Sequence, residues 1–348
     1  MTTASIPHSM RVPVFAGAGR VDFKDKPVPK PGPGQLLVRV GANALCGSDR
    51  HQFLQGSAVT PGHEAAGVVA LAGSDTKTQP GTFGAIFLMD FCGQCRSCRL
   101  GLTNQCLAKR ADMGFSHDGG YGPYMLIHEN IFFPIPADLK IDATDATLLL
   151  DIMGTGGHAM KRARVVHPDV QSVLVLGAGP IGLGVLAMAK LLLGNDVPVY
   201  ITDIMDARLK LAESLGGIPL NVRDATLGER LNAAGGPNLR ADVAIDTSGR
   251  TEARQAGLEA LGKRGVFVCV GHGGALNLNV SGQIIALERA VLGSEYFCFN
   301  EMPQNAELLR TNLPYMRQII THRFPLNEIQ SAYELFFAGS TGKVVIEQ

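Results

Sequence analysis

The sequence predicts an α/β protein in which a β-rich domain is followed by a domain built on a doubly wound parallel sheet. Short apolar segments separated by Gly and Pro fill residues 30–150 and predict the β-rich part. From residue 172 onward, apolar strands alternate with apolar helical stretches, which is the pattern of a parallel sheet. The length of 348 residues fits two domains of about 150 residues each.

The composition is that of a globular protein with balanced charge. Hydrophobic residues make up 46% of the chain, and 31 basic residues offset 31 acidic ones. Because nucleic-acid-binding domains usually present a basic face, no nucleic-acid partner is expected. No apolar run approaches the ~18–20 residues of a membrane helix, and the N-terminal MTTASIPHSMRV lacks the pattern of a signal peptide. We therefore expect no membrane partner either.

The first domain begins with a polar, Pro-containing lead-in at residues 1 to about 30. Along Gln35–Ala44 apolar and polar positions alternate, which predicts a strand that ends just before Cys46. The small apolar residues of 62–72 predict a further strand with His63 at its entry.

Residues 46–64 collect thiol, imidazole and carboxylate groups that have little structural reason to cluster. Cys46 and His63 are the residue types that bind zinc, and a catalytic zinc site keeps one position open for water or substrate. A lone cysteine is more often packing, and a lone histidine is more often a hydrogen-bonding residue. We interpret the pair as two ligands of a catalytic zinc, whose third ligand must come from elsewhere in the chain.

Four of the seven cysteines lie close together, which indicates a second metal site. Zinc bound by four thiolates in a short loop stabilises structure without taking part in chemistry. Two disulfides or an iron–sulfur cluster are the alternatives, and the clustering without a secretion signal argues against the disulfides. The same cysteine usage makes a reducing cytoplasm the expected compartment. The four residues are Cys92, Cys95, Cys98 and Cys106.

Asp151 stands between an apolar run and a Gly-rich turn, in TLLLDIMGTGG. A buried carboxylate here must be paired or bound to a metal ion. A helix cap or a turn would use an aspartate equally well, so the residue pattern leaves both interpretations open.

The segment from residue 172 to Asp203 predicts a dinucleotide site. An apolar strand runs into GAGPIG, then into an apolar helical stretch and a second strand that ends at Asp203. In this context the glycines let backbone amides approach a pyrophosphate at a helix N-terminus. Asp203 would bind the ribose diol and repel the phosphate of NADP, which favours NAD, although Arg208 could offset that repulsion. A Gly-rich turn without a nucleotide is the alternative. The loop residues are Gly177, Gly179, Pro180, Ile181 and Gly182.

With these motifs in order, the chain resembles the zinc-containing medium-chain alcohol and polyol dehydrogenases from end to end. The resemblance implies a GroES-like catalytic domain at residues 1–152, a Rossmann NAD-binding domain at 153–299 and a return to the catalytic domain at 300–348. It implies that Cys46 and His63 hold the catalytic zinc. The third ligand in this family is Cys, Glu or Asp, and the matching position here is Asp151.

The resemblance also implies roles for neighbouring residues in the oxidation of an alcohol by NAD. Ser48 begins a proton relay that His51 continues to solvent, and Asp49 fixes the tautomer of His63. Glu64 is an alternate zinc ligand. Apolar residues near the motifs are candidates for the substrate pocket, and they are Leu54, Leu88, Met113, Phe115 and Met153.

The expected activity is the oxidation of a secondary alcohol or polyol. Asp151 departs from the liver-type enzymes, which use Cys, and looks like the bacterial secondary-alcohol branch. That branch favours NADP, whereas Asp203 favours NAD, so a specific substrate does not transfer. An aldehyde reductase or a threonine-type dehydrogenase is the alternative within the family, and a non-catalytic NAD-binding protein or a zinc-free quinone-reductase relative lies outside it. A homotetramer is expected rather than a dimer.

Overall fold

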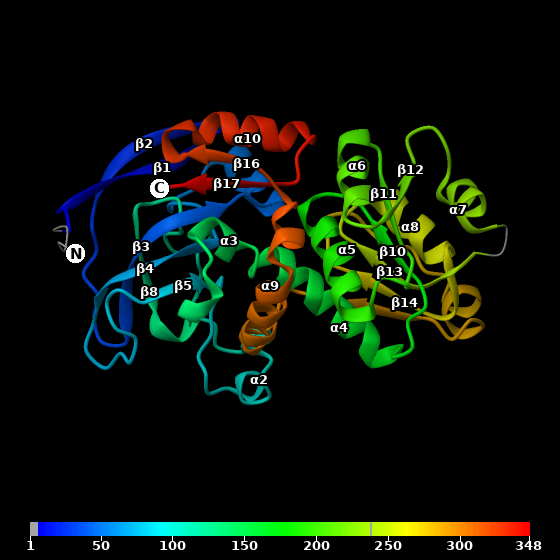
Figure 1. The fold of residues 1–348 in the computed structure, drawn as a ribbon, viewed down its shortest axis with the longest axis horizontal. Helices are drawn as coiled ribbons and strands as arrows, with labels where there is room; N and C mark the ends of the chain where they lie inside the picture. Colours follow the sequence, from blue (N-terminus) through cyan, green and yellow to red (C-terminus); the bar gives the residue numbers. More distant parts are fainter. Residues whose placement is uncertain (1–5, 237–238) are drawn as a thin grey trace.

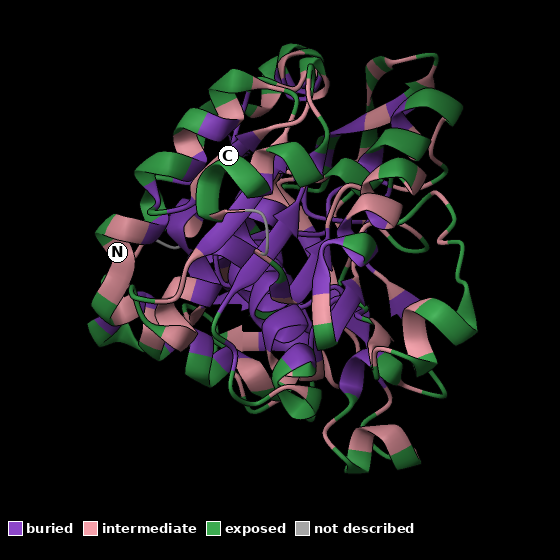
Figure 2. Ribbon diagram, turned by 90° about the vertical axis from the view of Figure 1, so that its right-hand side faces the viewer, coloured by how far each residue is buried: buried purple, intermediate pink, exposed green. Residues whose placement is uncertain are grey.

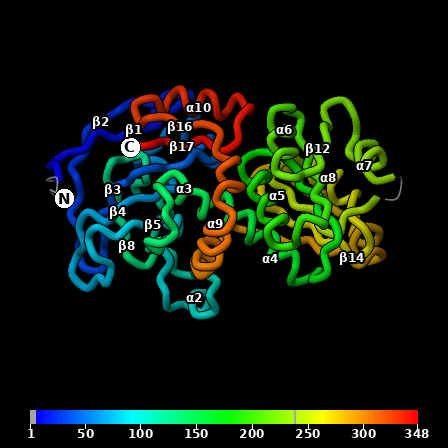
Figure 3. The backbone as a smooth tube through the Cα atoms, viewed as in Figure 1, coloured from blue at the N-terminus to red at the C-terminus, as the bar shows by residue number. Residues whose placement is uncertain are grey.

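The computed structural model describes residues 6–236 and 239–348, which form two lobes side by side (Figure 1). One lobe is rich in strands and contains both ends of the described chain. The other carries a parallel sheet flanked by helices. The backbone enters the second lobe near helix α4 (Gly156–Val166) and returns through helix α9 (Met302–Arg317), as the tube in Figure 3 shows.

A mixed seven-stranded sheet organises the first lobe. Its strands are β3 (Gln35–Ala44), β4 (Ala65–Ala72), β5 (Phe83–Ile86), β8 (Tyr124–His128), β9 (Phe132–Pro134), β16 (Ile320–Pro325) and β17 (Lys343–Glu347). They follow the order β16-β17-β3-β4-β5-β9, with β8 also paired to β3. The last strand of the chain therefore lies against β3, and the return segment completes this lobe. The smaller elements here are β6 (Met89–Asp90), β7 (Ala111–Asp112), α1 (Arg50–Gln55), α2 (Arg96–Arg99), α3 (Ala143–Thr147) and α10 (Ile329–Ala338).

The described part of the lead-in, from residue 6 onward, contains two strands that the sequence analysis does not predict. Strands β1 (Ser9–Gly17) and β2 (Arg20–Pro27) form an antiparallel hairpin there. Met10, Val12 and Phe15 are buried on one strand, while most side chains of its partner are exposed or half-buried. The polar second strand hides the alternation of the first, because only Val21 and Phe23 of β2 pack against the core and both are only partly buried.

The second lobe is a doubly wound α/β domain. Its strands are β10 (Val173–Leu176), β11 (Val199–Asp203), β12 (Ile218–Asn221), β13 (Ala241–Asp246), β14 (Leu261–Cys269) and β15 (Ala290–Gly293). They are all paired parallel in the order β12-β11-β10-β13-β14-β15. Numbered within the sheet this is 3-2-1-4-5-6, the dinucleotide-binding order, with its switch point between β10 and β13. Helices α5 (Pro180–Leu193), α6 (Asp206–Ser214), α7 (Leu227–Gly235) and α8 (Thr251–Glu259) flank it.

The hydrophobic core is continuous between the lobes. Figure 2 shows the buried residues concentrated on the strands and on the inner helix faces, with exposed residues at the periphery. Buried side chains of the mixed sheet, such as Val38 and Ile86, belong to the same cluster as Val185 of α5 and Ile245 of β13 in the second lobe. This shared core fixes the position of one lobe against the other, and therefore the shape of the cleft between them.

Candidate active site

Strand pairing brings Cys46 and His63 together. β3 and β4 are antiparallel with Asn43 opposite Ala65, so the end of β3 and the entry of β4 lie at the same edge of the sheet. Cys46 follows the end of β3, and His63 and Glu64 immediately precede β4. Asp151 arrives from a different direction, at the start of a π-helical turn that follows three buried leucines.

The four side chains present their ligating atoms to one point. Cys46 Sγ lies 3.1 Å from Asp151 Oδ2, and His63 Nε2 lies 3.8 Å from the same oxygen. Together with a carboxylate oxygen of Glu64, all these atoms lie within 4.8 Å of one another. Thiol, imidazole and carboxylate in this spacing are the donor set of a zinc site.

Acidic side chains crowd together in this buried cluster. Burial and the charge of Asp151 raise the pKa of the Cys46 thiol, and the same two causes raise the pKa of Glu64. Burial also acts to raise the pKa of Asp151, but His63 and Lys343 outweigh it and hold that pKa below its usual range. Buried charges are stable only when they are paired or bind metal. Glu64 Oε2 has no hydrogen-bond partner within the described residues, so a divalent cation fits this group.

Asp49 lies behind His63. Its Nδ1 lies 3.3 Å from Asp49 Oδ1, and both side chains are almost completely buried. Although burial acts to lower the pKa of His63, Asp49 is the largest of the influences that raise it well above its usual value. Asp49 Oδ2 accepts the backbone N–H of Cys46 at 3.2 Å. One carboxylate thus contacts both the histidine and the cysteine backbone, and leaves Nε2 free to bind a metal ion.

A cavity of about 750 Å³ opens above this group, between the lobes. Cys46, His63 and Asp151 line one end of it, and residues of the parallel-sheet lobe line the other. Ser48 also lines it, whereas the described residues that form its wall do not include His51, which is exposed on α1. Of the expected apolar contacts, Leu88 and Phe115 line the cavity, while Leu54 is exposed and Met113 and Met153 lie in the core.

The glycine-rich turn after β10 has the geometry of a nucleotide loop. Gly177 has φ +100°, and a side chain at Gly182 would place its Cβ only 1.8 Å from the Gly177 carbonyl oxygen. Gly179 precedes the first residue of α5, which is Pro180, where the missing N–H costs nothing. Ile181 lines the cavity. Backbone amides at this helix start can therefore approach a phosphate.

Asp203 ends β11 beside this turn. Its Oδ2 accepts the N–H of Ala178 at 2.9 Å, and its Oδ1 accepts the N–H groups of Ile204 and Met205 at 2.8 and 2.9 Å. Arg208 Nη1 lies 3.8 Å from Oδ2. The carboxylate is thus fixed by the backbone next to the phosphate loop, with a guanidinium close by.

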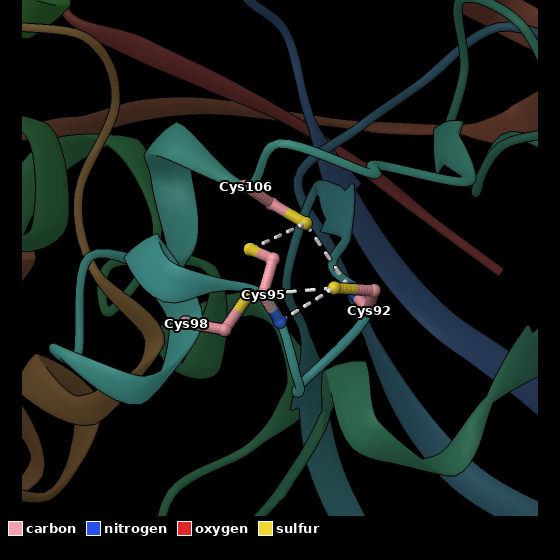
Figure 4. A group of neighbouring side chains, drawn as sticks. All are labelled: Cys92, Cys95, Cys98 and Cys106. Atoms are coloured by element: carbon pink, nitrogen blue, oxygen red, sulfur yellow. Dashed lines mark hydrogen bonds between the residues drawn. The ribbon is translucent and has the colours of Figure 1, made fainter.

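The four clustered cysteines converge in a separate loop around α2 (Figure 4). Cys92 and Cys98 have their sulfur atoms 4.0 Å apart, and those of Cys95 and Cys106 are 3.9 Å apart. Hydrogen bonds from the backbone N–H groups of Cys98 and Leu107 lower the pKa of Cys95 to about 6. Backbone donors to sulfur stabilise thiolates, so this loop is suited to a metal ion bound by four thiolates.

A third group of residues of metal-binding type is explained by contacts within the chain, without a metal ion. His158, Cys298 and Glu301 lie within 4.8 Å of one another. His158 Nδ1 is 2.6 Å from Glu301 Oε1, and Lys161 Nζ is 3.1 Å from Glu301 Oε2. Both oxygens of Glu301 are thus occupied by side chains of α4, so we interpret this group as a polar cluster that joins α4 to the start of α9.

Comparisons with known proteins agree with this geometry. Residues 32–137 match the family model of the alcohol dehydrogenase GroES-like domain, and residues 180–311 match that of the zinc-binding dehydrogenases. An L-threonine 3-dehydrogenase of Chromobacterium violaceum is 30% identical over 94% of this chain and 96% of its own length. The chain belongs to the zinc-dependent medium-chain dehydrogenase family.

Two further relatives extend along nearly the whole chain. The zinc-type alcohol dehydrogenase-like protein YphC of Escherichia coli K12, itself uncharacterized, is 29% identical over 97% of this chain and 98% of its own. The solved structure of an alcohol dehydrogenase of E. coli CFT073 in complex with NADH has a TM-score of 0.88 at 22% identity, covering 98% of this chain and all of that one. This medium-chain dehydrogenase is therefore an oxidoreductase of the alcohol dehydrogenase type, with a GroES-like and a Rossmann lobe, that uses zinc and a nicotinamide cofactor. No helix in the described ranges is long and apolar enough to span a membrane.

Sequence reasoning missed several residues of this dehydrogenase site. Lys343 is fully buried and pairs with Glu64. In the sequence, the feature that could have indicated this role is a lysine at the start of an apolar strand. Arg50 and Arg250 line the cavity from different lobes, and each looks like an ordinary surface residue in sequence. Tyr296 also lines the cavity, with φ +46°, a left-handed conformation that costs an aromatic residue about 1–3 kcal/mol and is common at functional sites. No local sequence pattern indicates that Tyr296 belongs to the site.

Proposed function

We propose that this protein oxidises a secondary alcohol or a polyol to the ketone, with NAD as hydride acceptor and a catalytic zinc ion bound by Cys46, His63 and Asp151. The observation that carries the proposal is that these three side chains line the same cavity as Ile181 of the nucleotide loop. An alcohol at the metal site and a nicotinamide placed by the loop would then meet in one space. Hydride transfer requires this proximity.

The zinc ion, when bound, acts as a Lewis acid that lowers the pKa of an alcohol. The chain supplies the remaining functions. Asp49 orients His63, and Lys343 draws Glu64 into an ion pair, so that Glu64 is held beside the site as an alternate ligand. The cysteine loop would bind a second, structural zinc through Cys92, Cys95, Cys98 and Cys106.

The proton leaves the cavity by the proposed relay. Ser48 lines the cavity beside Cys46 and is placed to accept the proton of the alcohol. His51 is exposed one turn further along and can pass a proton to water. Among the described residues of the cavity wall Ser48 is present and His51 is not, so the ribose of a bound NAD would be needed to connect the two.

Preference for NAD follows from the charge of Asp203. A carboxylate beside the phosphate loop repels the 2′-phosphate of NADP and accepts hydrogen bonds from a ribose diol. Arg208 is close enough to weaken this repulsion. We therefore propose a preference for NAD, not strict exclusion of NADP.

The test is NADH formation with primary alcohols, secondary alcohols, polyols and amino alcohols, with NAD and NADP in parallel. We expect turnover with secondary alcohols or polyols and NAD, which a zinc chelator stops. The matched control is Cys46→Ala, which should lose turnover while still binding NAD. An active Cys46→Ala enzyme would show that the metal assignment is wrong.

A threonine-type amino-alcohol dehydrogenase is the second candidate, favoured by the 30% identity to the enzyme of Chromobacterium violaceum. The amino-alcohol arm of the same panel decides between the two. Turnover of L-threonine above that of every polyol would replace the first candidate.

The remaining expectations are also proposals. We place the domain boundaries at residues 1–152, 153–299 and 300–348. We propose a homotetramer, which sedimentation would distinguish from a dimer, and a location in the cytoplasm.

A further inference from the structure

Asp49 connects His63 to a buried pair of tyrosines from distant parts of the chain. Tyr333 lies on α10, and Tyr121 lies in the loop before β8. The Tyr333 hydroxyl donates to Asp49 Oδ2 at 2.7 Å, and the two phenol oxygens lie 2.8 Å apart. Both tyrosines are completely buried.

The direction of these hydrogen bonds follows from a count of protons. A phenol has a single hydrogen to donate, and a carboxylate is a stronger acceptor than another phenol. Tyr333 therefore donates to Asp49 and accepts from Tyr121, whose hydroxyl also lies 3.3 Å from the Ala44 carbonyl oxygen, a longer contact. The ring of Tyr333 is fixed by Phe15 and Phe53, with centroids at 5.1 and 5.2 Å, so its hydroxyl has a defined position.

The two oxygens of Asp49 have separate partners. Oδ1 faces His63 Nδ1 at 3.3 Å, while Oδ2 accepts from Tyr333 and from the Cys46 N–H. The hydrogen bonds to Oδ2 fix the plane of the Asp49 carboxylate. They thereby fix the position of Oδ1, the oxygen that faces His63. Groups outside the ligand set that orient a metal-binding histidine commonly govern metal affinity.

We propose that Tyr333, supported by Tyr121, is a positioning residue of the catalytic metal centre, which holds Asp49 so that His63 presents Nε2 to the metal ion. The inference rests on the proposed function, since it requires a metal ion at Cys46, His63 and Asp151. Tyr333 does not belong to the described residues that line the cavity, so it acts on the reaction only through Asp49.

A purely structural role makes a different prediction. Tyr333 belongs to an aromatic cluster in which a phenylalanine ring would pack equally well. If packing were its function, removal of the hydroxyl would leave the metal centre unchanged. The hydroxyl alone therefore separates the two roles.

The experiment compares Tyr333→Phe with the wild-type, zinc-loaded protein. Zinc affinity of the Cys46 site is measured by chelator competition, and the four-cysteine site serves as an internal reference. We expect about a ten-fold weaker affinity at the Cys46 site, at the lower end of the 10–100-fold losses that follow removal of such partners. After exchange with Co²⁺, the visible d–d bands of this site should shift, because the histidine ligand is reoriented.

Two further variants complete the design. Tyr315→Phe makes the same chemical change on α9, where the hydroxyl donates to the Leu215 carbonyl at 2.8 Å, and should change neither readout. Tyr121→Phe should weaken zinc binding in the same direction by a smaller factor, and it decides the question if Tyr333→Phe does not fold.

The outcomes separate the inference from the proposed function. Folded Tyr333→Phe protein with wild-type zinc affinity and an unchanged cobalt spectrum overturns the positioning role. Wild-type protein that binds zinc at the four cysteines alone overturns the proposed function, and the positioning role with it. Selective weakening at the Cys46 site supports both.

Discussion

Replacing Lys343 with methionine should destabilise the protein far more than a typical loss of one charge. Lys343 begins β17 and pairs with Glu64, which immediately precedes β4, the second strand from β17 in the sheet. The exposed fractions of the two side chains are 1% and 0%. Methionine is an unbranched side chain of similar length to lysine, but it leaves the Glu64 carboxylate buried beside Asp151 without the ammonium group that pairs with it.

The magnitude follows from the burial of the pair. Breaking a buried ion pair by removing one partner costs about 3–5 kcal/mol. At about 2 °C per kcal/mol for a chain of this size, Tm should fall by about 6–10 °C. The loss should be largest in metal-free protein, because a bound zinc ion would replace part of the missing positive charge.

Thermal unfolding of metal-free protein tests this value. The double variant Glu64→Gln with Lys343→Met removes both charges and should recover most of the loss. The matched control is Lys26→Met, whose partner Asp118 is 45% exposed, so that about 1 kcal/mol or less is expected. A Tm for Lys343→Met within 2 °C of the wild type, or no lower than that of the control, would refute the reasoning.

Three further outcomes follow from the structure. Cys98→Ser should lower Tm and remove the structural zinc, and loss of activity from a protein that stays fully folded and zinc-loaded would contradict this. Asp203→Ser should raise kcat/KM for NADP relative to NAD by about ten-fold or more, and an unchanged ratio would mean that the ribose is recognised elsewhere. The pKa of Glu301 is lowered because His158 and Lys161 together outweigh its burial. Its contribution to stability is therefore complete above the ordinary pKa of about 4.3 and is lost as pH falls below it. Glu301→Gln should lower Tm at pH 7 and reduce the loss of stability between pH 5 and 3, as followed by thermal unfolding; an acid profile identical to wild type would exclude this pair as a cause.

The sequence determined those parts of the site in which the chemistry is local. The four cysteines lie in one loop, so their spacing alone indicates a metal site, and the loop brings them together. The glycine-rich turn between β10 and α5 is likewise a local conformation: Gly177 has a positive φ, and Gly182 packs against the Gly177 carbonyl oxygen of the same turn. Strand periodicity placed Cys46 and His63 at the ends of strands, where backbone pairing alone brings them together.

Tertiary structure decided everything that depends on charge and hydrogen bonding through space. Lys343 and Tyr333 lie near the end of the chain, yet they contact Glu64 and Asp49 from its beginning. No local sequence pattern encodes such partners, because only the fold brings these distant residues close together. Once they are buried, the low polarity of the site strengthens the interaction between them. The hairpin of β1 and β2 was missed for a related reason, since its burial is created by residues such as Tyr333 that pack on Phe15. Residue type and spacing thus specify which chemistry is present, and the fold specifies which groups surround and tune it.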